Sequence, residues 1–399
     1  MDPFPETFIR TLHDQPWQVV LAATGGGSRA IAELLAVPGG SLILAEAVVP
    51  YSTAALTDWL GSPPEQFCSA QTARSMAMQA FLRMRKLATT GDRPSRLRSN
   101  ENESSQSAVG LACTASLASE PPKRGPHRIH VACQTATLTA CASLELKKGY
   151  RTRAVEEQLA AQLLLNQLAI AGATPARLPL ELLPEEQIKA SHAAAPAAWT
   201  DLLLDRRRLT GQRGSTPTAG GPVPASAIFP GAFHPLHAGH LKIAEVAEAI
   251  LGQRVEYEIS LENVDKPPLD FIELTSRAGQ FGEESTLWFT RSATFLEKSR
   301  LFPQATFVVG VDTVQRIADA RYYGDEPARR DAAVAEIAAA GCRFLVFGRA
   351  SADGFRTLRE LDLPPALRAH CREVSAEQFR ADISSSSLRR AAPEDAEET

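Results

Sequence analysis

The sequence predicts an α/β protein with two folded domains, and three features of the chain support this. At about 150 residues per domain, its 399 residues correspond to two or three domains. Short apolar runs typical of strands alternate with segments of helical periodicity, first over residues 17–172 and again over 225–399. The intervening residues 173–224 are rich in Pro, Ala, Gly and Thr. We therefore predict a first domain over 1–172, a flexible linker over 173–224 and a second domain over 225–399.

Composition and charge exclude several classes of protein. Hydrophobic residues make up 44% of the chain and charged residues 22%, which is typical of globular proteins and not of disordered ones. The net charge of −4 argues against a nucleic-acid binder. No apolar run reaches ~18 residues, so no membrane span is predicted. Residues 1–17 lack the apolar core of a signal peptide, and we expect a cytoplasmic protein.

The cysteines predict neither disulfides nor a zinc site. None are in C-x-x-C spacing and no Cys/His cluster is apparent, so we expect reduced, mostly buried thiols. They are Cys68, Cys113, Cys133, Cys141, Cys342 and Cys371.

The first region alternates predicted strands and helices around a polar insertion. Its apolar runs and helical periods predict the following elements. The expected strands are residues 18–23, 41–44, 47–50, 109–113 and 129–132, and the expected helices are 29–35, 71–86 and 155–170. Residues 87–108 are polar and predict a flexible insertion.

The second region predicts a parallel sheet, because strands and helices alternate regularly. The expected strands are residues 227–229, 255–261, 286–289, 307–309 and 344–347. A helix over 240–251 ends at Gly252. Within the linker, one short helix is predicted from Trp199 to about Leu209.

The segment from Gly231 to His240, GAFHPLHAGH, follows a predicted strand and opens a predicted helix. Ligands bind at such junctions in parallel sheets, and a helix N-terminus attracts phosphate. His237 and His240 are three residues apart and share one face of the helix, so both imidazoles can donate to one phosphate group. Gly231 and Gly239 leave room where a triphosphate approaches the backbone.

Other interpretations of this segment are weaker. A capped turn with solvated histidines does not explain three of the chain's eight histidines within seven residues. Two histidines without nearby Cys, Asp or Glu are a poor zinc site, so no metal ligands are predicted. The segment lacks the Walker sequence G-x-x-x-x-G-K-[ST].

A second segment, residues 383–390, has the sequence ISSSSLRR. Serines at a helix start offer hydroxyl and N–H groups to phosphate, and Arg389 adds a cationic fork. A serine run near a terminus is by itself more often a cap or a tail.

The two segments together resemble the nucleotidylyltransferase superfamily. Residues 237–240 match its H-x-G-H signature, and residues 383–389 match its I-S-S-x-x-x-R signature. The resemblance covers residues 225–390 and implies a Rossmann-like parallel sheet that binds ATP with Mg²⁺. In such enzymes a substrate phosphate attacks the α-phosphate of ATP and pyrophosphate leaves, so alignment and charge stabilisation provide the catalysis.

The resemblance implies a role for individual residues. His237, His240 and Arg389 would be catalytic, with the imidazoles on the α- and β-phosphates. The expected ATP-binding residues are Gly231, Phe233, Gly239, Gly310, Asp312, Ser384, Ser385 and Ser386.

Residues between the signatures resemble nicotinamide/nicotinate mononucleotide adenylyltransferases. Residues 259–268 are similar to the stretch that carries a phosphate-facing lysine in that family, here Lys266. Residues 307–313 are similar to its G-x-D strand end, which contacts the ribose of adenosine. Lys266 and Trp288 are accordingly expected to bind the mononucleotide. An ordinary exposed lysine is an equal alternative for Lys266, and pantetheine-phosphate adenylyltransferases share both signatures.

The first region resembles the CinA carboxyl-terminal family, whose members deamidate nicotinamide mononucleotide. The resemblance covers residues 11–171. It rests on Thr24-Gly25-Gly26 after a strand and on residues 38–41 and 48–52.

Three departures from the CinA pattern affect its chemistry. The family sequence A-E-S-C-T-G-G places a nucleophilic serine where this chain has Ala22, and Leu56 replaces a usual lysine. The family loop T-G-I-A-G-P has no glycines here, over residues 114–119. Since an alanine methyl cannot attack an amide, we expect the fold without deamidase activity.

The leading expectation is therefore adenylyl transfer from ATP to nicotinamide or nicotinate mononucleotide, which forms a dinucleotide and releases pyrophosphate. One alternative is a nucleotidylyltransferase with another acceptor, such as phosphopantetheine. Another is a catalytically silent regulatory protein that binds pyridine nucleotides. The expected partners are small-molecule nucleotides and further copies of this chain in a homo-oligomer, with no nucleic acid and no membrane.

Overall fold

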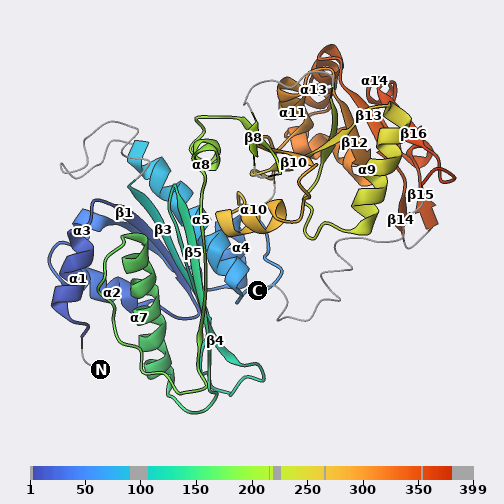
Figure 1. Ribbon diagram of the computed structural model, residues 1–399. Helices are drawn as coiled ribbons and strands as arrows, with labels where there is room; N and C mark the ends of the chain where they lie inside the picture. Colours follow the sequence, from blue (N-terminus) through green and yellow to red (C-terminus); the bar gives the residue numbers. More distant parts are fainter. Residues whose placement is uncertain are drawn as a thin grey trace. The chain divides into compact units, whose positions relative to one another are not determined.

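The computed structural model describes residues 3–89, 107–214, 216–218, 226–264, 267–351 and 354–379. The chain divides into two compact units, each with its own large sheet (Figure 1). The first unit comprises Met1–Thr200 and Asp265–Glu273, and the second comprises Asp201–Val264 and Leu274–Glu397. The predicted α/β class with two domains is confirmed.

The first unit contains a six-stranded sheet in the order β2-β1-β3-β4-β5-β6. β2 and β3 run parallel to β1, whereas β3, β4, β5 and β6 pair antiparallel in succession. The strands are β1 (Gln18–Thr24), β2 (Leu44–Val48), β3 (Ala108–Ser116), β4 (His127–Gln134), β5 (Leu138–Leu146) and β6 (Ile188–Ala194).

Helices cover both faces of the first sheet, which is why all seven residues of β1 are buried. Val19 and Leu21 belong to a core shared with α1, α2 and α7, whereas Ala22 belongs to a core shared with α4 and α5. This is the alternation of a strand between two layers. The helices are α1 (Glu6–His13), α2 (Arg29–Ala36), α3 (Gly40–Ile43), α4 (Thr53–Leu60), α5 (Ala70–Thr89) and α7 (Arg153–Ala171).

Two short predicted strands in the first region differ from the structure. Residues 41–44 mostly form α3, and β2 takes only the beginning of residues 47–50. A four-residue apolar run has no periodicity that separates helix from strand. Ile43 is fully buried although it lies in a helix, so its apolar side chain does not distinguish a helix from a strand here. Residues 90–106, most of the predicted insertion, lie outside the described residues.

The second unit contains an eight-stranded sheet in the order β16-β13-β12-β9-β10-β11-β7-β8. The strands from β16 to β11 are parallel, and β7 and β8 add antiparallel at one edge. The strands are β7 (Leu209–Arg213), β8 (Thr216–Thr218), β9 (Ala227–Pro230), β10 (Val255–Ser260), β11 (Thr286–Thr290), β12 (Thr306–Gly310), β13 (Arg343–Phe347) and β16 (Cys371–Val374). β14 (Arg349–Ser351) and β15 (Gly354–Arg356) form a separate hairpin.

The strand order of this sheet reverses beside β9. The chain passes from β9 to β10 and β11 on one side, then returns to β12 on the other side of β9 and continues to β13 and β16. Parallel sheets bind ligands at such a switch point, at the carboxyl ends of the strands. The end of β9 is therefore the position in this unit where a ligand is expected.

Helices connect the parallel strands of the second unit. They are α9 (Ala238–Leu251), α11 (Phe295–Leu301), α12 (Val311–Ala318), α13 (Pro327–Ala339) and α14 (Pro365–Arg368), with two 3-10 turns at Ala320–Tyr323 and Leu358–Glu360. Two further helices, α8 (Ala197–Leu203) and α10 (Phe271–Ala278), each have residues in both units. Over the ranges that the structure describes, no helix combines the length and apolarity that crossing a membrane requires.

The described part of residues 173–224 contains regular structure, in contrast to the linker predicted from its composition. β6 pairs with β5 in the first sheet, and β7 and β8 extend the second sheet beyond β11. Six of the seven β6 residues are exposed, so backbone hydrogen bonds and not apolar burial hold this edge strand. Such a strand leaves no hydrophobic pattern in the sequence. Residues 215 and 219–224 lie outside the described residues.

Candidate functional site

Both predicted histidines lie on the loop between β9 and α9. The Gly231 N–H donates to the carbonyl of Glu258 on the adjacent strand β10 at 2.9 Å. The loop then turns at Phe233, whose φ of 45° is left-handed, and α9 begins with His237 as its N-cap. The sequence motif therefore lies at the carboxyl end of a parallel strand, as predicted, and the structure places this strand beside the switch point of the sheet.

The imidazoles of His237 and His240 stack on one another, with ring centroids 3.7 Å apart and planes inclined by 24°. The His237 N–H donates to Nδ1 of His240 at 3.3 Å. Because a neutral imidazole whose Nδ1 accepts carries its proton on Nε2, His240 presents an Nε2–H donor. Nδ1 of His237 is buried and has no hydrogen-bond partner within the described part of the chain. The pair therefore offers polar atoms that the loop itself does not use.

The surroundings of the two histidines lower the pKa of each ring, which favours the uncharged forms. Burial and the neighbouring His237 lower the pKa of His240 to about 4. Burial also lowers the pKa of His237. The rings therefore donate N–H groups without carrying a charge of their own, and a nearby anion would favour their charged form.

Two phenylalanine rings pack against the His240 ring. Its ring lies 5.1 Å from that of Phe233 and 6.1 Å from that of Phe229, both edge-on. Phe233, predicted to bind ATP, has only 1% of its surface exposed. Its side chain therefore positions His240 and does not reach a ligand.

The two predicted glycines make room for rings of the site. A Cβ on Gly231 would lie 2.5 Å from the Phe233 ring, and a Cβ on Gly239 would lie 3.0 Å from the His237 ring. We predicted that these glycines allow a triphosphate to approach the backbone. The structure shows that they also allow the aromatic and imidazole rings to pack over the loop, and the approach of a triphosphate stays a prediction.

Side chains that the sequence analysis did not identify hold this loop in place. Gln280 accepts the Leu236 N–H at 2.7 Å and donates to the Phe233 carbonyl at 3.0 Å. Arg277 donates to the Ala232 carbonyl at 3.1 Å. Both residues are distant from the motif in the sequence and bind the loop through its backbone carbonyl and N–H groups, so no local signal could have revealed them.

The predicted G-x-D strand end lies on the strand next to β9. β12 pairs with β9 and ends at Gly310, which is the N-cap of α12. Asp312, in the first turn of that helix, forms an ion pair with Arg349. The fold thus brings Gly310 to the same sheet edge as the histidine loop, whereas the Asp312 carboxylate already has a cationic partner.

Of the remaining predicted site residues, Trp288 is the one within the described ranges. The Trp288 side chain packs in the apolar core with Phe302, and its Nε1–H donates to Glu256 at 2.6 Å. This placement contradicts a direct contact between Trp288 and a mononucleotide. Lys266, Ser384, Ser385, Ser386 and Arg389 lie outside the described residues.

The corresponding loop of the first unit, between β1 and α2, is occupied by a carboxylate of the chain itself. Glu157 of α7 accepts the Gly27 N–H at 2.9 Å, the Ser28 hydroxyl at 2.9 Å and the Arg29 N–H at 3.0 Å. These donors are the groups that would otherwise bind a ligand phosphate. These three donors of the loop are therefore not free to bind an anion.

The two positions where the CinA pattern expects serine and lysine lie in one apolar cluster. Ala22 is fully buried and Leu56 is 2% exposed, and both pack with residues of α5 such as Met76 and Ala77. Neither a nucleophile nor a base is present at these positions.

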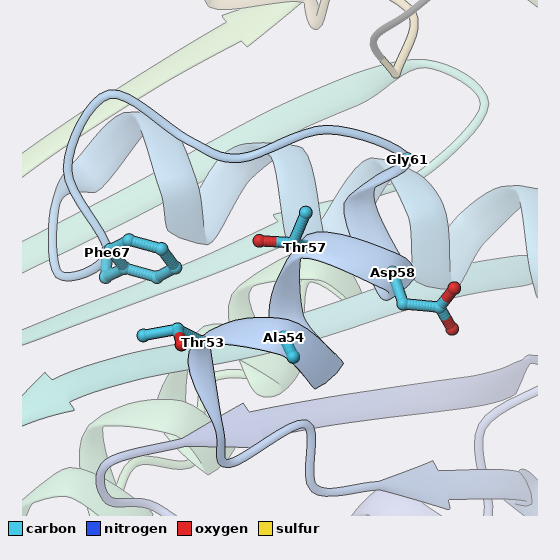
Figure 2. A pocket seen from close by; sticks show the side chains of 6 residues that line it. All are labelled: Thr53, Ala54, Thr57, Asp58, Gly61 and Phe67. Carbon is cyan, nitrogen blue, oxygen red and sulfur yellow. The ribbon is translucent and has the colours of Figure 1, made fainter.

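A shallow hollow of about 590 Å³ lies elsewhere on the first unit. Figure 2 shows Thr53 and Thr57 of α4 on the side of Phe67, whereas the Asp58 side chain points away from Phe67. Asp58 is the only ionisable side chain among the lining residues, so the hollow offers little chemistry.

Comparisons with known proteins gave similarity only to solved structures. No family model and no curated protein matches the chain. One similar structure is the competence/damage inducible protein CihA from Agrobacterium tumefaciens, with 20% identity over 43% of this chain and 99% of that protein, at a TM-score of 0.30. Another is a competence-damaged protein (CinA) superfamily protein from Escherichia coli, with 15% identity over 41% of this chain and 87% of that protein, at a TM-score of 0.31.

Proposed function

We propose that the second unit transfers the adenylyl group of ATP to a pyridine mononucleotide and releases pyrophosphate. The observation that carries this proposal is the stacked pair His237 and His240 at the carboxyl end of β9, where the strand order reverses. A phosphate placed there meets two imidazoles and the N-terminus of α9, all of which favour an anion.

The proposed adenylyl transfer requires hydrogen-bond donors to the reacting phosphate and no general base. The attacking phosphate of the acceptor is already an anion, so no residue has to remove a proton from it. His240 would donate from Nε2 to an oxygen of the α-phosphate and stabilise the charge that develops there. The aromatic support and the hydrogen bond from the His237 backbone fix the ring before ATP binds, so little reorganisation is needed.

Mg²⁺ would arrive with the triphosphate. In the described ranges, no three His, Cys, Asp or Glu side chains are grouped as a metal site. The ligands of the ion would therefore be phosphate oxygens and water, which Mg²⁺ commonly retains. When bound, the ion would neutralise charge on the leaving pyrophosphate.

The residues proposed to bind the β- and γ-phosphates of ATP are identified from the sequence. The ISSSSLR segment, with Ser384, Ser385 and Arg389, would bind the β- and γ-phosphates. Replacing Arg389 by alanine should weaken ATP binding and leave the thermal stability of the protein unchanged.

For the first unit we propose a retained fold without deamidase activity. Ala22 and Leu56 fill the positions of the expected serine and lysine with apolar groups. Incubation with nicotinamide mononucleotide should release no ammonia.

A panel of acceptors tests the proposal. The full chain, ATP and Mg²⁺ are incubated with nicotinamide mononucleotide, nicotinate mononucleotide or phosphopantetheine, and pyrophosphate is measured. We expect release with at least one pyridine mononucleotide. Release with phosphopantetheine alone would indicate another transferase, since residues 259–268 and 307–313 support the pyridine acceptor only by resemblance. No release with any acceptor would favour a silent nucleotide-binding protein.

A further inference from the structure

Residues 267–273 belong to the first unit, although the chain on both sides of them belongs to the second. They lead into α10, which begins at Phe271. Asp270 caps this helix, because its Oδ1 accepts the Glu273 N–H at 3.0 Å.

Arg74 of α5 binds both acidic residues of this segment. Its Nε donates to Oδ2 of Asp270 and its terminal nitrogen donates to Oε1 of Glu273, each at 3.0 Å. The Arg74 side chain is 11% exposed and that of Asp270 is 6% exposed. Burial alone would lower the pKa of the guanidinium, but Asp270, Cys141 and Glu273 outweigh burial and raise it.

Two buried polar side chains of the first sheet form a chain of hydrogen bonds to the backbone of the same segment. The Phe271 N–H donates to Oγ1 of Thr139 on β5 at 3.0 Å. The Thr139 hydroxyl in turn donates to Oε1 of Gln134 at 2.6 Å, and both residues are fully buried. A free N–H at the start of a helix is thus satisfied by the sheet.

The apolar residues of the segment pack on the face that carries Ala22 and Leu56. Phe271 is fully buried, and Ile272 packs against the cluster that contains Ala22 and Leu56. The Arg74 guanidinium therefore binds the two acidic residues, and the Thr139 hydroxyl accepts the backbone N–H. The two apolar side chains of the segment are buried or pack against the apolar cluster.

We propose that this face of the first unit, formed by β5, α4 and α5, is a peptide-binding site. Its ligand is a short segment of acidic–apolar–apolar–acidic pattern that opens a helix, supplied here by Asp270-Phe271-Ile272-Glu273. The site occupies the face where the CinA pattern places its deamidase residues, so a peptide replaces the small-molecule substrate there. This proposal is independent of adenylyl transfer by the second unit.

Competition by a free peptide tests the site in the full chain. The triple variant Asp270→Ala/Phe271→Ala/Glu273→Ala removes the internal ligand and leaves the receiving residues intact. A dye-labelled peptide of residues 267–278 should bind this variant at least tenfold more tightly than it binds the wild-type chain, measured by fluorescence anisotropy. Adding Arg74→Met should remove the gain, and a peptide with Asn and Gln in place of Asp270 and Glu273 should not bind. Equal binding to the wild type and the triple variant, or no effect of Arg74→Met, would overturn the proposal.

Hydrogen exchange provides a second measurement that does not depend on folding of the triple variant. Thr139→Val keeps the side-chain shape but removes the acceptor for the Phe271 N–H. Peptides that cover residues 267–273 should exchange at least tenfold faster in this variant than in the matched surface variant Arg10→Met. Unchanged exchange of these peptides in Thr139→Val would contradict the proposed recognition.

Discussion

Each unit has a glycine-containing loop between a parallel strand and a helix, but the two loops treat their polar groups in opposite ways. After β1, the N–H groups of Gly27 and Arg29 are both bound by Glu157. After β9, His237 and His240 stack with polar atoms left over. The position on the fold is favourable for an anion in both cases. The difference shows that the side chains around a loop decide which of its polar groups already have a partner within the chain.

The largest expected effect comes from removing the donor of the second loop. His240→Ala should lower the rate of pyrophosphate release on the order of 10²-fold or more, because it removes a fixed donor to the reacting phosphate. The matched control is His192→Ala, since His192 lies on the exposed strand β6. Near-normal turnover of His240→Ala would show that the two loops are equally inert.

Removing Glu157, the carboxylate that accepts from the first loop, should lower the stability of the protein and leave its turnover unchanged. Glu157→Ala leaves three donors without their carboxylate and should lower the free energy of unfolding by about 2 kcal/mol. Glu145→Ala, at an exposed position of β5, should change it by less than about 0.5 kcal/mol. Chemical denaturation measures both variants, and equal stabilities would contradict the structural role of Glu157.

Introducing a hydroxyl at Ala22, where the CinA pattern has serine, should not confer deamidase activity. Ala22→Ser places a polar group in a fully buried apolar cluster and should cost about 1 kcal/mol of stability. It should release no ammonia from nicotinamide mononucleotide, because Leu56 supplies no base. Ala190→Ser on β6 is the neutral control. Ammonia release by the Ala22→Ser variant would contradict the expectation that Leu56 leaves this position without a base.

The smallest expected effect is a pH dependence of stability that comes from His240 in the second loop. The pKa of His240 is about 4 in the folded chain, below the 6.5 of an unperturbed histidine. As the pH falls below about 6.5, the unfolded chain takes up this proton first, so stability decreases down to about pH 4. Thermal unfolding at several pH values should show a smaller loss for His240→Gln than for the wild type. Equal losses would place the titrating group elsewhere.

The sequence predicted those parts of the molecule whose residues are marked by a local pattern. The strand before Gly231, the loop and the helix that ends at Gly252 all appeared where expected, because apolar periodicity and a glycine stop determine them. β6 was missed because an exposed edge strand needs no apolar side chains. α3 was predicted as a strand because a four-residue run fits either structure.

The contents of the site were harder to predict than its position. Trp288 was expected at a mononucleotide, yet its side chain is part of the core, and Gln280 and Arg277 hold the loop without any motif of their own. Glu157, which closes the first loop, lies some 130 residues away from it in the sequence. Such tertiary contacts depend on the packing of distant elements, and one sequence alone does not encode them in a local pattern.

The most direct test of the central claim observes the imidazoles themselves. Histidine-labelled protein is titrated with ATP, and the ring signals of His237 and His240 are followed by NMR across a range of pH. We predict that both signals shift on ATP addition and that the pKa of His240 rises from about 4, because a bound phosphate favours its charged form. ATP binding that leaves both signals unchanged would contradict the account.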